Sequence, residues 1–414
     1  MTPLRAAVSS TKSLHPGGKN GMRSQDSPQR TSLREWLAVV SIAGGTFALV
    51  TAQFLPIGLM SSIARDLQIT EQQSGLLVTI PGLISAVAAP ALLVASGKLD
   101  RRYVIWLLTS LLVVSDVVVS IGDNLLVMLM GSILLGIGAG GFWALGTALA
   151  GRLVAPRSVG QAMTLVFGGV SAGIVLGVPA GTLLGHAFGW RAAFMATAGL
   201  TLTVLMAQIL LLPGVKPAKA ITLPQLGAVF RAPQALVALF GATLVVVGQF
   251  MAYTYITPIL EHYARASPTA ISFLLFAFGA AGFFGNFIGG AWVQRNVYSA
   301  LTIITLMLGS MLILLPFLVT NEVSATILVI IWGLFYGGVP VGFQTWVLRA
   351  APNITESAGA VFIAVFQFAV AGGAMLGGTI VERYSLSANL ILGGIAVLTT
   401  ALIICCFSRA QVIS

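Results

Sequence analysis

Residues 213–232, PGVKPAKAITLPQLGAVFRA, form the longest polar break in the chain after its N-terminal tail. The break carries Lys216, Lys219 and Arg231, and prolines interrupt it, so that no regular helix can run through it unbroken. Six apolar segments precede this break and six follow it. A chain divided in this way predicts two repeated bundles of membrane helices with a pathway between them.

The flanking segments are too apolar for a protein that folds in water. The chain has 414 residues, of which 57% are apolar and 8% are charged, whereas globular domains carry about 25% charged residues. A helix needs about 20 mostly apolar residues to cross a bilayer. We therefore expect an all-α membrane protein with twelve transmembrane helices in two pseudo-symmetric six-helix bundles. The predicted spans are 36–60, 74–96, 103–121, 124–147, 160–188, 192–212, 233–260, 269–290, 299–319, 324–349, 356–380 and 386–407.

The central break also fixes the expected domain boundaries. We expect a disordered cytoplasmic tail at 1–35, an N-terminal bundle at 36–212, a cytoplasmic linker at 213–232, a C-terminal bundle at 233–407 and a second cytoplasmic tail at 408–414. The first tail is rich in Ser, Gly, Pro and basic residues, which disfavour a packed core. Within the linker, Leu223, Leu226, Val229 and Phe230 fall at helical spacing and predict a short helix on the inner membrane surface.

The basic residues are distributed unevenly between the two sides of the predicted bundle. The two tails and the loops after every second span hold 17 of the 21 Lys and Arg residues, and the other side holds Arg65, Arg191, Arg265 and Arg383. The positive-inside rule places the basic side in the cytoplasm. We therefore expect a multi-pass protein of the cell inner membrane, with both termini cytoplasmic. The topology accounts for the net charge of +10, so we expect the lipid bilayer, and no nucleic acid, as partner. We also expect a monomer.

The sequence offers little support for an enzyme. His15, His186 and His262 lie in the tail or near helix ends, without the spacing of metal ligands. No GxxxxGK[ST] phosphate loop is present, so nothing indicates a pump driven by ATP. We expect no catalytic residues, no metal and no cofactor. A transporter-like sensor would need a soluble signalling domain, for which the central break is too short.

The loop after the second span carries a recognisable motif, Gly97-Lys98-Leu99-Asp100-Arg101-Arg102. It resembles the cytoplasmic loop motif of the major facilitator superfamily, roughly G-x-L-x-D-R-x-G-R. The resemblance implies a conformational latch formed by Gly97, Asp100, Arg101 and Arg102 between helix ends. The family's later Gly-Arg pair is absent from this copy, so we expect a weaker latch.

The fifth span carries a second motif, formed by Gly173, Gly177, Pro179 and Gly181. It is similar to the glycine-proline motif that marks exporters of the twelve-span drug/proton antiporter branch of that superfamily. Here Val178 separates the usual adjacent Gly and Pro. The four-residue spacing of the glycines also predicts a close helix–helix contact, with a bend at the proline.

Several strings resemble the purine ribonucleoside (inosine-type) efflux pumps of the same branch. Examples are Gly140-Gly141-Phe142-Trp143-Ala144, Gly248-Gln249-Phe250, Tyr253-Thr254-Tyr255-Ile256 and Val339-Pro340-Val341-Gly342. The resemblance implies a secondary active exporter that works by alternating access and exchanges a small molecule, a purine nucleoside, for protons. Arabinose-type and multidrug exporters share several of these strings, so sugar or drug efflux remains an alternative.

Polar and aromatic residues inside the spans are the candidates for substrate binding. They are Gln53, Trp143, Gln249, Tyr253, Tyr255, Asn286 and Gln344. Amides can bond to a base and to ribose hydroxyls, and aromatic rings can stack on a base. The alternative for each amide is a hydrogen bond between helices, and for each ring it is packing. Spans 1, 4, 7 and 10 line the cavity in the superfamily, which favours the residues on those spans.

The energy source is the open question. The pumps that this chain resembles carry glutamate at the position of Gln53 and arginine at the position of Ser132, and neither replacement can carry a proton. Asp116 is the only acidic residue well within a span, so it is the candidate for proton coupling. The alternatives are that Asp116 turns outward and that the protein is an uncoupled facilitator.

Overall fold

The computed structural model describes residues 32–96, 99–215 and 223–413. Every regular element in these residues is a helix, and twelve of their helices are long and apolar enough to cross a bilayer. The expected fold class is therefore confirmed. Residues 1–31 of the expected disordered tail lie outside the described residues, whereas residues 32–35 form the N-cap and first turn of the first helix.

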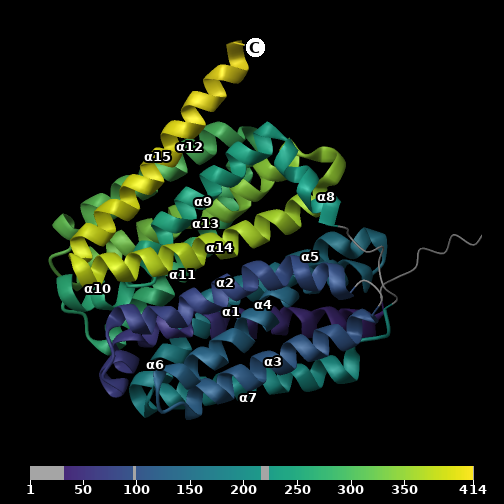
Figure 1. Cartoon of the computed structure of the whole chain (residues 1–414), viewed down its shortest axis with the longest axis horizontal. Helices are drawn as coiled ribbons and strands as arrows, with labels where there is room; N and C mark the ends of the chain where they lie inside the picture. The colour runs from purple at the N-terminus through teal and green to yellow at the C-terminus, as the bar shows by residue number, and fades with distance from the viewer. Residues whose placement is uncertain (1–31, 97–98, 216–222, 414) are drawn as a thin grey trace, which may run out of the picture.

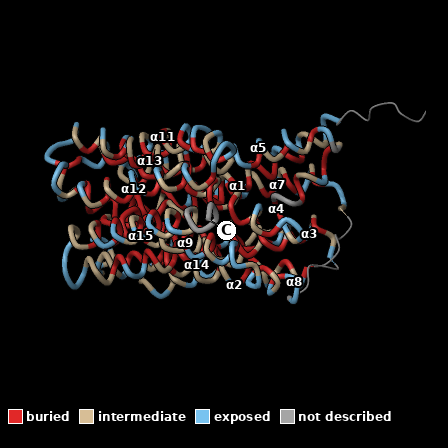
Figure 2. The backbone as a smooth tube through the Cα atoms, turned by 90° about the horizontal axis from the view of Figure 1, so that it is seen from above, coloured by how far each residue is buried: buried red, intermediate tan, exposed pale blue. Residues whose placement is uncertain are grey.

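Figure 1 shows two layers of helices, one from each half of the chain. The N-terminal bundle contains α1 (Leu33–Leu67), α2 (Glu71–Ala95), α3 (Arg101–Ile121), α4 (Leu125–Arg152), a composite fifth span of α5 (Val159–Ala172), the π-helix η3 (Gly173–Gly177) and α6 (Val178–Phe188), and α7 (Trp190–Leu211). The C-terminal bundle contains α9 (Pro233–Tyr253), α10 (Ile256–Tyr263), α11 (Pro268–Arg295), α12 (Val297–Leu318), α13 (Glu322–Ala350), α14 (Thr355–Arg383) and α15 (Leu386–Ile413). Viewed at right angles, both bundles have buried residues along their interiors (Figure 2).

Local capping fixes where the long helices begin. Ser32 and Glu35 form a capping box at the start of α1, and Thr70 and Gln73 form another at the start of α2. Such boxes satisfy backbone N–H groups that the first helical turn leaves free. We call the end of the molecule that carries residues 212–215 and 223–232 the linker end. The opposite end, which carries the α1–α2 turn and residues 254–267, is the far end.

The linker contains a short helix, as its apolar spacing predicts. α8 (Leu223–Ala228) is followed by a 3-10 turn at Val229–Arg231. Leu226 and Val229 are buried in the main core, whereas Phe230 is 51% exposed. The apolar face of this segment therefore packs mainly on protein, which differs from a helix that only lies on the membrane.

The seventh span differs from its prediction as one continuous helix over 233–260. α9 ends at Tyr253, and the chain makes a break at Thr254 and Tyr255 before α10 continues. Hydropathy alone could not show this break, because apolar residues continue on both sides of it. The break directs α10 toward α1 of the other bundle, where the Thr257 hydroxyl donates to the Ile57 carbonyl at 2.8 Å.

The glycines of the fifth span form the packing stripe that their spacing predicts. A β-carbon added at Gly173 would lie 2.9 Å from Val50, and one added at Gly177 would lie 1.9 Å from the Thr51 hydroxyl. Both neighbours belong to α1, so the stripe lets the two backbones approach within one bundle. The other side of η3 touches the second bundle, since a β-carbon at Gly279 would lie 2.9 Å from the Ile174 carbonyl oxygen.

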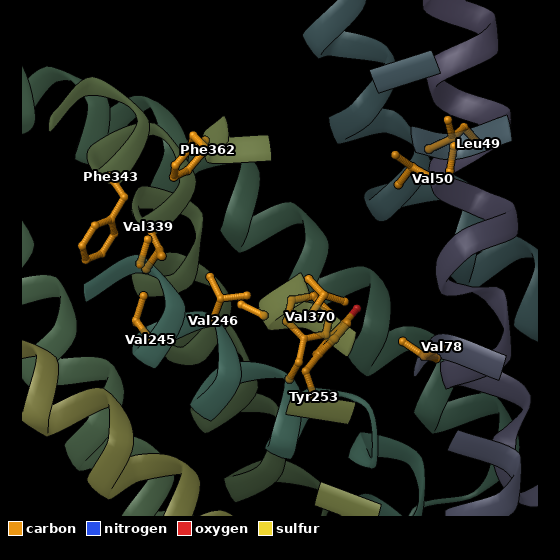
Figure 3. Close-up of a cluster of buried hydrophobic side chains, with 14 of the residues drawn as sticks. Leu49, Val50, Val78, Val245, Val246, Tyr253, Val339, Phe343, Phe362 and Val370 are labelled. Carbon is orange, nitrogen blue, oxygen red and sulfur yellow. The ribbon is translucent and has the colours of Figure 1, made fainter. Parts of the chain in front are cut away.

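The two bundles share one continuous core. Figure 3 shows Val78 of the N-terminal bundle facing the region of Tyr253 and Val370, and all three belong to the same buried cluster. On the same boundary the Gln367 amide of α14 donates to the Ser85 hydroxyl of α2 at 3.1 Å. Both partners are buried, so a specific hydrogen bond adds to the apolar contacts between the bundles.

Candidate functional site

An aromatic cluster lies where α1, α9, α11 and α13 converge. Its members are Phe54, Phe250, Tyr253, Phe278, Trp332 and Tyr336. The rings of Tyr253 and Phe278 stack with centroids 4.6 Å apart, and Trp332 meets Tyr253 edge-on at 6.1 Å. Phe54 comes from the other bundle and stacks on Phe250 at 5.9 Å. The cluster therefore joins the two bundles through ring faces, which are also suitable surfaces for a planar ligand.

Gln249 adds a polar side chain to this cluster, and only one end of its amide is hydrogen-bonded. Its side-chain oxygen accepts a hydrogen bond from the Trp332 indole at 2.8 Å. Its amide nitrogen has no partner among the described residues, although the residue is fully buried. A buried donor without a partner costs about 1–3 kcal/mol. A ligand that accepts a hydrogen bond here would recover that cost.

Gln53 offers a complementary group on α1. Its exposed fraction is 2%, and its side-chain oxygen has no hydrogen-bond partner among the described residues. The next residue, Phe54, reaches the aromatic cluster. α1 thus adds an open acceptor close to the boundary, while α9 supplies the open donor of Gln249.

The other predicted substrate residues are more scattered. Trp143 of α4 is half-buried and packs on the main core, and Tyr253 lies inside the aromatic cluster. Asn286 of α11 is exposed, and Gln344 of α13 is half-buried. Of the predicted substrate residues, the structure therefore brings Gln249 and Tyr253 together at the aromatic cluster. Gln53 directly precedes Phe54, which belongs to that cluster.

Tyr255 lies away from the cluster, in the break between α9 and α10. Its hydroxyl donates to the Ala374 carbonyl at 3.0 Å. A β-carbon at Gly75 of α2 would lie 2.2 Å from this hydroxyl, and one at Gly378 of α14 would lie 2.3 Å from it. The ring is therefore seated between two glycines from opposite bundles, a position that suits a gate better than a cavity wall.

Polar contacts also join the two bundles at the far end. The Ser61 hydroxyl of α1 donates to the Glu261 carboxylate of α10 at 2.7 Å, and the Gln72 amide of α2 donates to the Thr379 hydroxyl of α14 at 3.3 Å. Together with the seated Tyr255, these contacts close the far end of the boundary.

The loop motif after the second span connects helix ends at the linker end. Asp100 is the N-cap of α3, and its carboxylate accepts from the backbone N–H of Arg102 at 2.9 Å and of Val215 at 3.1 Å. Arg101 is buried and donates to the Ser96 hydroxyl at 2.5 Å. Asp100 therefore ties α3 to the start of the linker, while Gly97 lies outside the described residues.

Asp116 lies inside the N-terminal bundle, with an exposed fraction of 1%. It lines a void of about 10 Å³ together with Ser115, Ser132 and apolar residues of α1, α2, α4 and α7. Such a void has about the space that one water molecule needs. One carboxyl oxygen has no hydrogen-bond partner among the described residues, and the Thr201 hydroxyl lies beside the group. The alternative that Asp116 turns outward is wrong.

The sequence gives little indication that the other aromatic residues of the cluster belong to the site. Phe278 and Tyr336 lie in spans with several aromatic residues, and no spacing marks them as different from Phe283 or Phe284, which are exposed. Trp332 lies in the tenth span, and the sequence could not show its bond to Gln249, because that bond joins two different helices.

Comparison with known proteins agrees with this architecture. A family model described as the Major Facilitator Superfamily matches residues 42–374, which include parts of both bundles. The purine ribonucleoside efflux pump NepI of Escherichia coli (strain K12) is 32% identical over 369 residues, covering 89% of this chain and 93% of that pump. The pump of the same name from Shigella dysenteriae serotype 1 (strain Sd197) is also 32% identical over 369 residues, which cover 89% of this chain and 94% of that pump. The chain therefore belongs to the major facilitator superfamily and is a multi-pass transporter of the inner membrane.

Proposed function

We propose that this transporter exports purine nucleosides in exchange for protons. The single observation that carries the substrate class is the open amide nitrogen of Gln249 within the aromatic cluster. A purine has flat faces that stack on rings and ring nitrogens that accept hydrogen bonds. Gln53 adds an acceptor for a ribose hydroxyl or an exocyclic amine. The similarity to pumps named for purine ribonucleosides supports the same class.

The transport cycle that we propose is alternating access. The bundles rock about the aromatic cluster, so that the substrate is open to one side at a time. The structure has a closed far end, held by Ser61, Glu261 and Tyr255. In our proposal both termini and the linker end face the cytoplasm, the far end faces outward, and the protein acts as a monomer.

Binding of a ligand panel to the purified protein in lipid nanodiscs tests the substrate class. Inosine, adenosine and guanosine should displace a labelled nucleoside from one common site, because the rings and amides read the shared purine and ribose. Arabinose and a cationic drug should displace it poorly. Strong binding of arabinose or of the drug, with no binding of any nucleoside, would replace the proposal with sugar or multidrug efflux.

The Asp100 latch predicts a separate effect on rate. Asp100→Asn keeps the capping oxygen but removes the charge, so folding and substrate binding should survive. Transport should slow by roughly 2- to 30-fold, the range for a coupling change of about 0.5–2 kcal/mol. Flux in proteoliposomes at matched protein content measures it.

Asp123→Asn is the matched control, because Asp123 lies just beyond the other end of α3 with its side chain 92% exposed. Equal flux in the Asp100 variant, the Asp123 variant and the parent would show that the loop is only a solvated turn.

A further inference from the structure

A cavity of about 540 Å³ opens at the far end of the N-terminal bundle. The last turns of α1, the end of α6 and the first turn of α7 line it. None of its lining residues belongs to the aromatic cluster or to the void beside Asp116. Ligand pockets in proteins have volumes of about 300–1,000 Å³, so this cavity is large enough to hold a ligand of its own.

One wall of the cavity is a network of fixed side chains. The Asp66 carboxylate accepts from the Trp190 indole at 3.0 Å and pairs with the Arg191 guanidinium. The central carbon of that guanidinium lies 4.2 Å from the centre of the Trp190 ring, and the group also donates to the Gly122 carbonyl at 3.2 Å. The network holds α1, α7 and the turn after α3 together, so the wall is formed before any ligand arrives.

Arg65 and His186 add hydrogen-bond donors that remain open, and both residues line the cavity. Arg65 donates through Nε to the Ser61 carbonyl at 3.1 Å, and its two terminal nitrogens have no hydrogen-bond partner among the described residues. The Nε2 atom of His186 is buried and also has no partner among those residues. A phosphate group accepts hydrogen bonds from a guanidinium and from an imidazole N–H, so one phosphate would satisfy both side chains.

The charge of the cavity wall also favours an anion. Two arginines, Arg65 and Arg191, face a single carboxylate, Asp66, among the lining residues that the structure describes. Glu261 of α10 acts on His186 electrostatically, but its carboxylate accepts a hydrogen bond from α1 and does not line the cavity. The wall therefore keeps a net positive charge.

The exposed side of the fifth span leads to this cavity. Leu176, Ala180, Leu183 and Ala187 recur at helical spacing, and all four are exposed. Phe188 follows them, is 78% exposed and lines the cavity. In a helix that crosses a bilayer, an exposed apolar stripe of this kind lies against lipid chains. A ligand with its phosphate in the cavity could thus lay an apolar chain along the fifth span.

We propose that this cavity binds the phosphate headgroup of a phospholipid from the leaflet at the far end. Arg65 and His186 donate to the phosphate, and Phe188 and the exposed stripe of the fifth span contact an acyl chain. An anionic headgroup is preferred, because the wall is positive. Basic pockets between membrane helices hold lipid headgroups in this way, and Trp190 has the interfacial place that tryptophan favours. The site requires neither the proposed nucleoside nor the proposed proton.

Photo-crosslinking in nanodiscs tests the site. The discs contain phosphatidylcholine and a small fraction of phosphatidylglycerol that carries a photoreactive group near the top of one acyl chain. Peptides crosslinked in the parent should include residues 183–191. Arg65→Gln should weaken the apparent affinity at this peptide about tenfold, because a charged hydrogen bond to the phosphate is lost. His186→Phe should weaken it by roughly 2- to 10-fold, as expected for a single hydrogen bond.

Arg383→Gln is the matched control, because Arg383 is an exposed arginine at the far end of the other bundle. This variant should crosslink as the parent does. Phe188→Ser should weaken lipid binding, since it removes the apolar contact beside the headgroup. Inorganic phosphate, added at constant ionic strength, should displace little of the lipid because it has no acyl chain. Complete displacement by inorganic phosphate would mean that the cavity is a site for free phosphate and would overturn the lipid proposal.

Thermal unfolding supplies a second measurement that does not depend on crosslinking. Phosphatidylglycerol should raise the Tm of the parent above its value in pure phosphatidylcholine discs, because a ligand of the folded state stabilises it. In Arg65→Gln the Tm in pure phosphatidylcholine should be unchanged, and the rise should be smaller. Equal crosslinking in Arg65→Gln and the parent, or an equal loss in Arg383→Gln, would overturn the proposal.

Discussion

Replacing Gln249 by leucine should weaken nucleoside binding by roughly 5- to 150-fold, the equivalent of about 1–3 kcal/mol for a buried hydrogen bond that can no longer form. Leucine has a similar volume, so the aromatic cluster should keep its packing. The loss should be the same for inosine, adenosine and guanosine if the amide reads a group that all three share. Equilibrium binding to the purified variant in nanodiscs measures it.

The design must separate binding from stability, because Gln249 also accepts the Trp332 indole bond. Trp332→Phe removes that bond but leaves the amide nitrogen open to the ligand, so it should lower thermal stability more than affinity. Gln208→Leu is a second control, since Gln208 is a fully buried amide whose bonds to Thr109 and to the Ser41 carbonyl lie within the N-terminal bundle. Unchanged affinity in Gln249→Leu, or an equal loss in Gln208→Leu, would remove Gln249 from the substrate site.

The architecture could be predicted from the sequence because lipid imposes it directly. Each span needs a long apolar run, and the break at 213–232 is the one long polar interruption between such runs. The glycine stripe was also predictable, since its four-residue period places Gly173 and Gly177 on one helix face. The helix that packs against the stripe was not predictable. The glycine spacing shows that the fifth span packs closely on another helix but does not identify α1 as that helix.

The site was predictable only in part. Gln249 and Tyr253 stood out as a polar and an aromatic residue in a span that should line the cavity, and the structure joins both to Trp332. Tyr255, two residues beyond Tyr253, points to a different place because the helix breaks between them. Glu261 attracted no notice in the sequence, because its hydrogen-bond partner Ser61 is on the other bundle, 200 residues away in the chain.

The largest effect on energy coupling should come from Asp116→Asn. In proteoliposomes containing the parent, a pH gradient should drive nucleoside accumulation against its concentration gradient. The variant should bind nucleoside normally and exchange it at equilibrium, but it should lose the accumulation. Asparagine has nearly the same shape and cannot take up or release a proton in the physiological range. The carboxyl group it replaces is the one titratable side chain that lines the void between α1, α2, α3, α4 and α7.

The position of this void explains how a proton on Asp116 could act on the substrate site. Ala52 and Pro56 of α1 line the void, and Gln53 and Phe54 lie between them in the sequence. A change in the charge of Asp116 would therefore act electrostatically on the adjacent segment of α1, which reaches the aromatic cluster. Ser132→Ala is the matched control, because it alters the same void without changing a titratable group. Accumulation that survives Asp116→Asn would eliminate Asp116 as the proton carrier, and a parent that ignores the gradient would be an uncoupled facilitator.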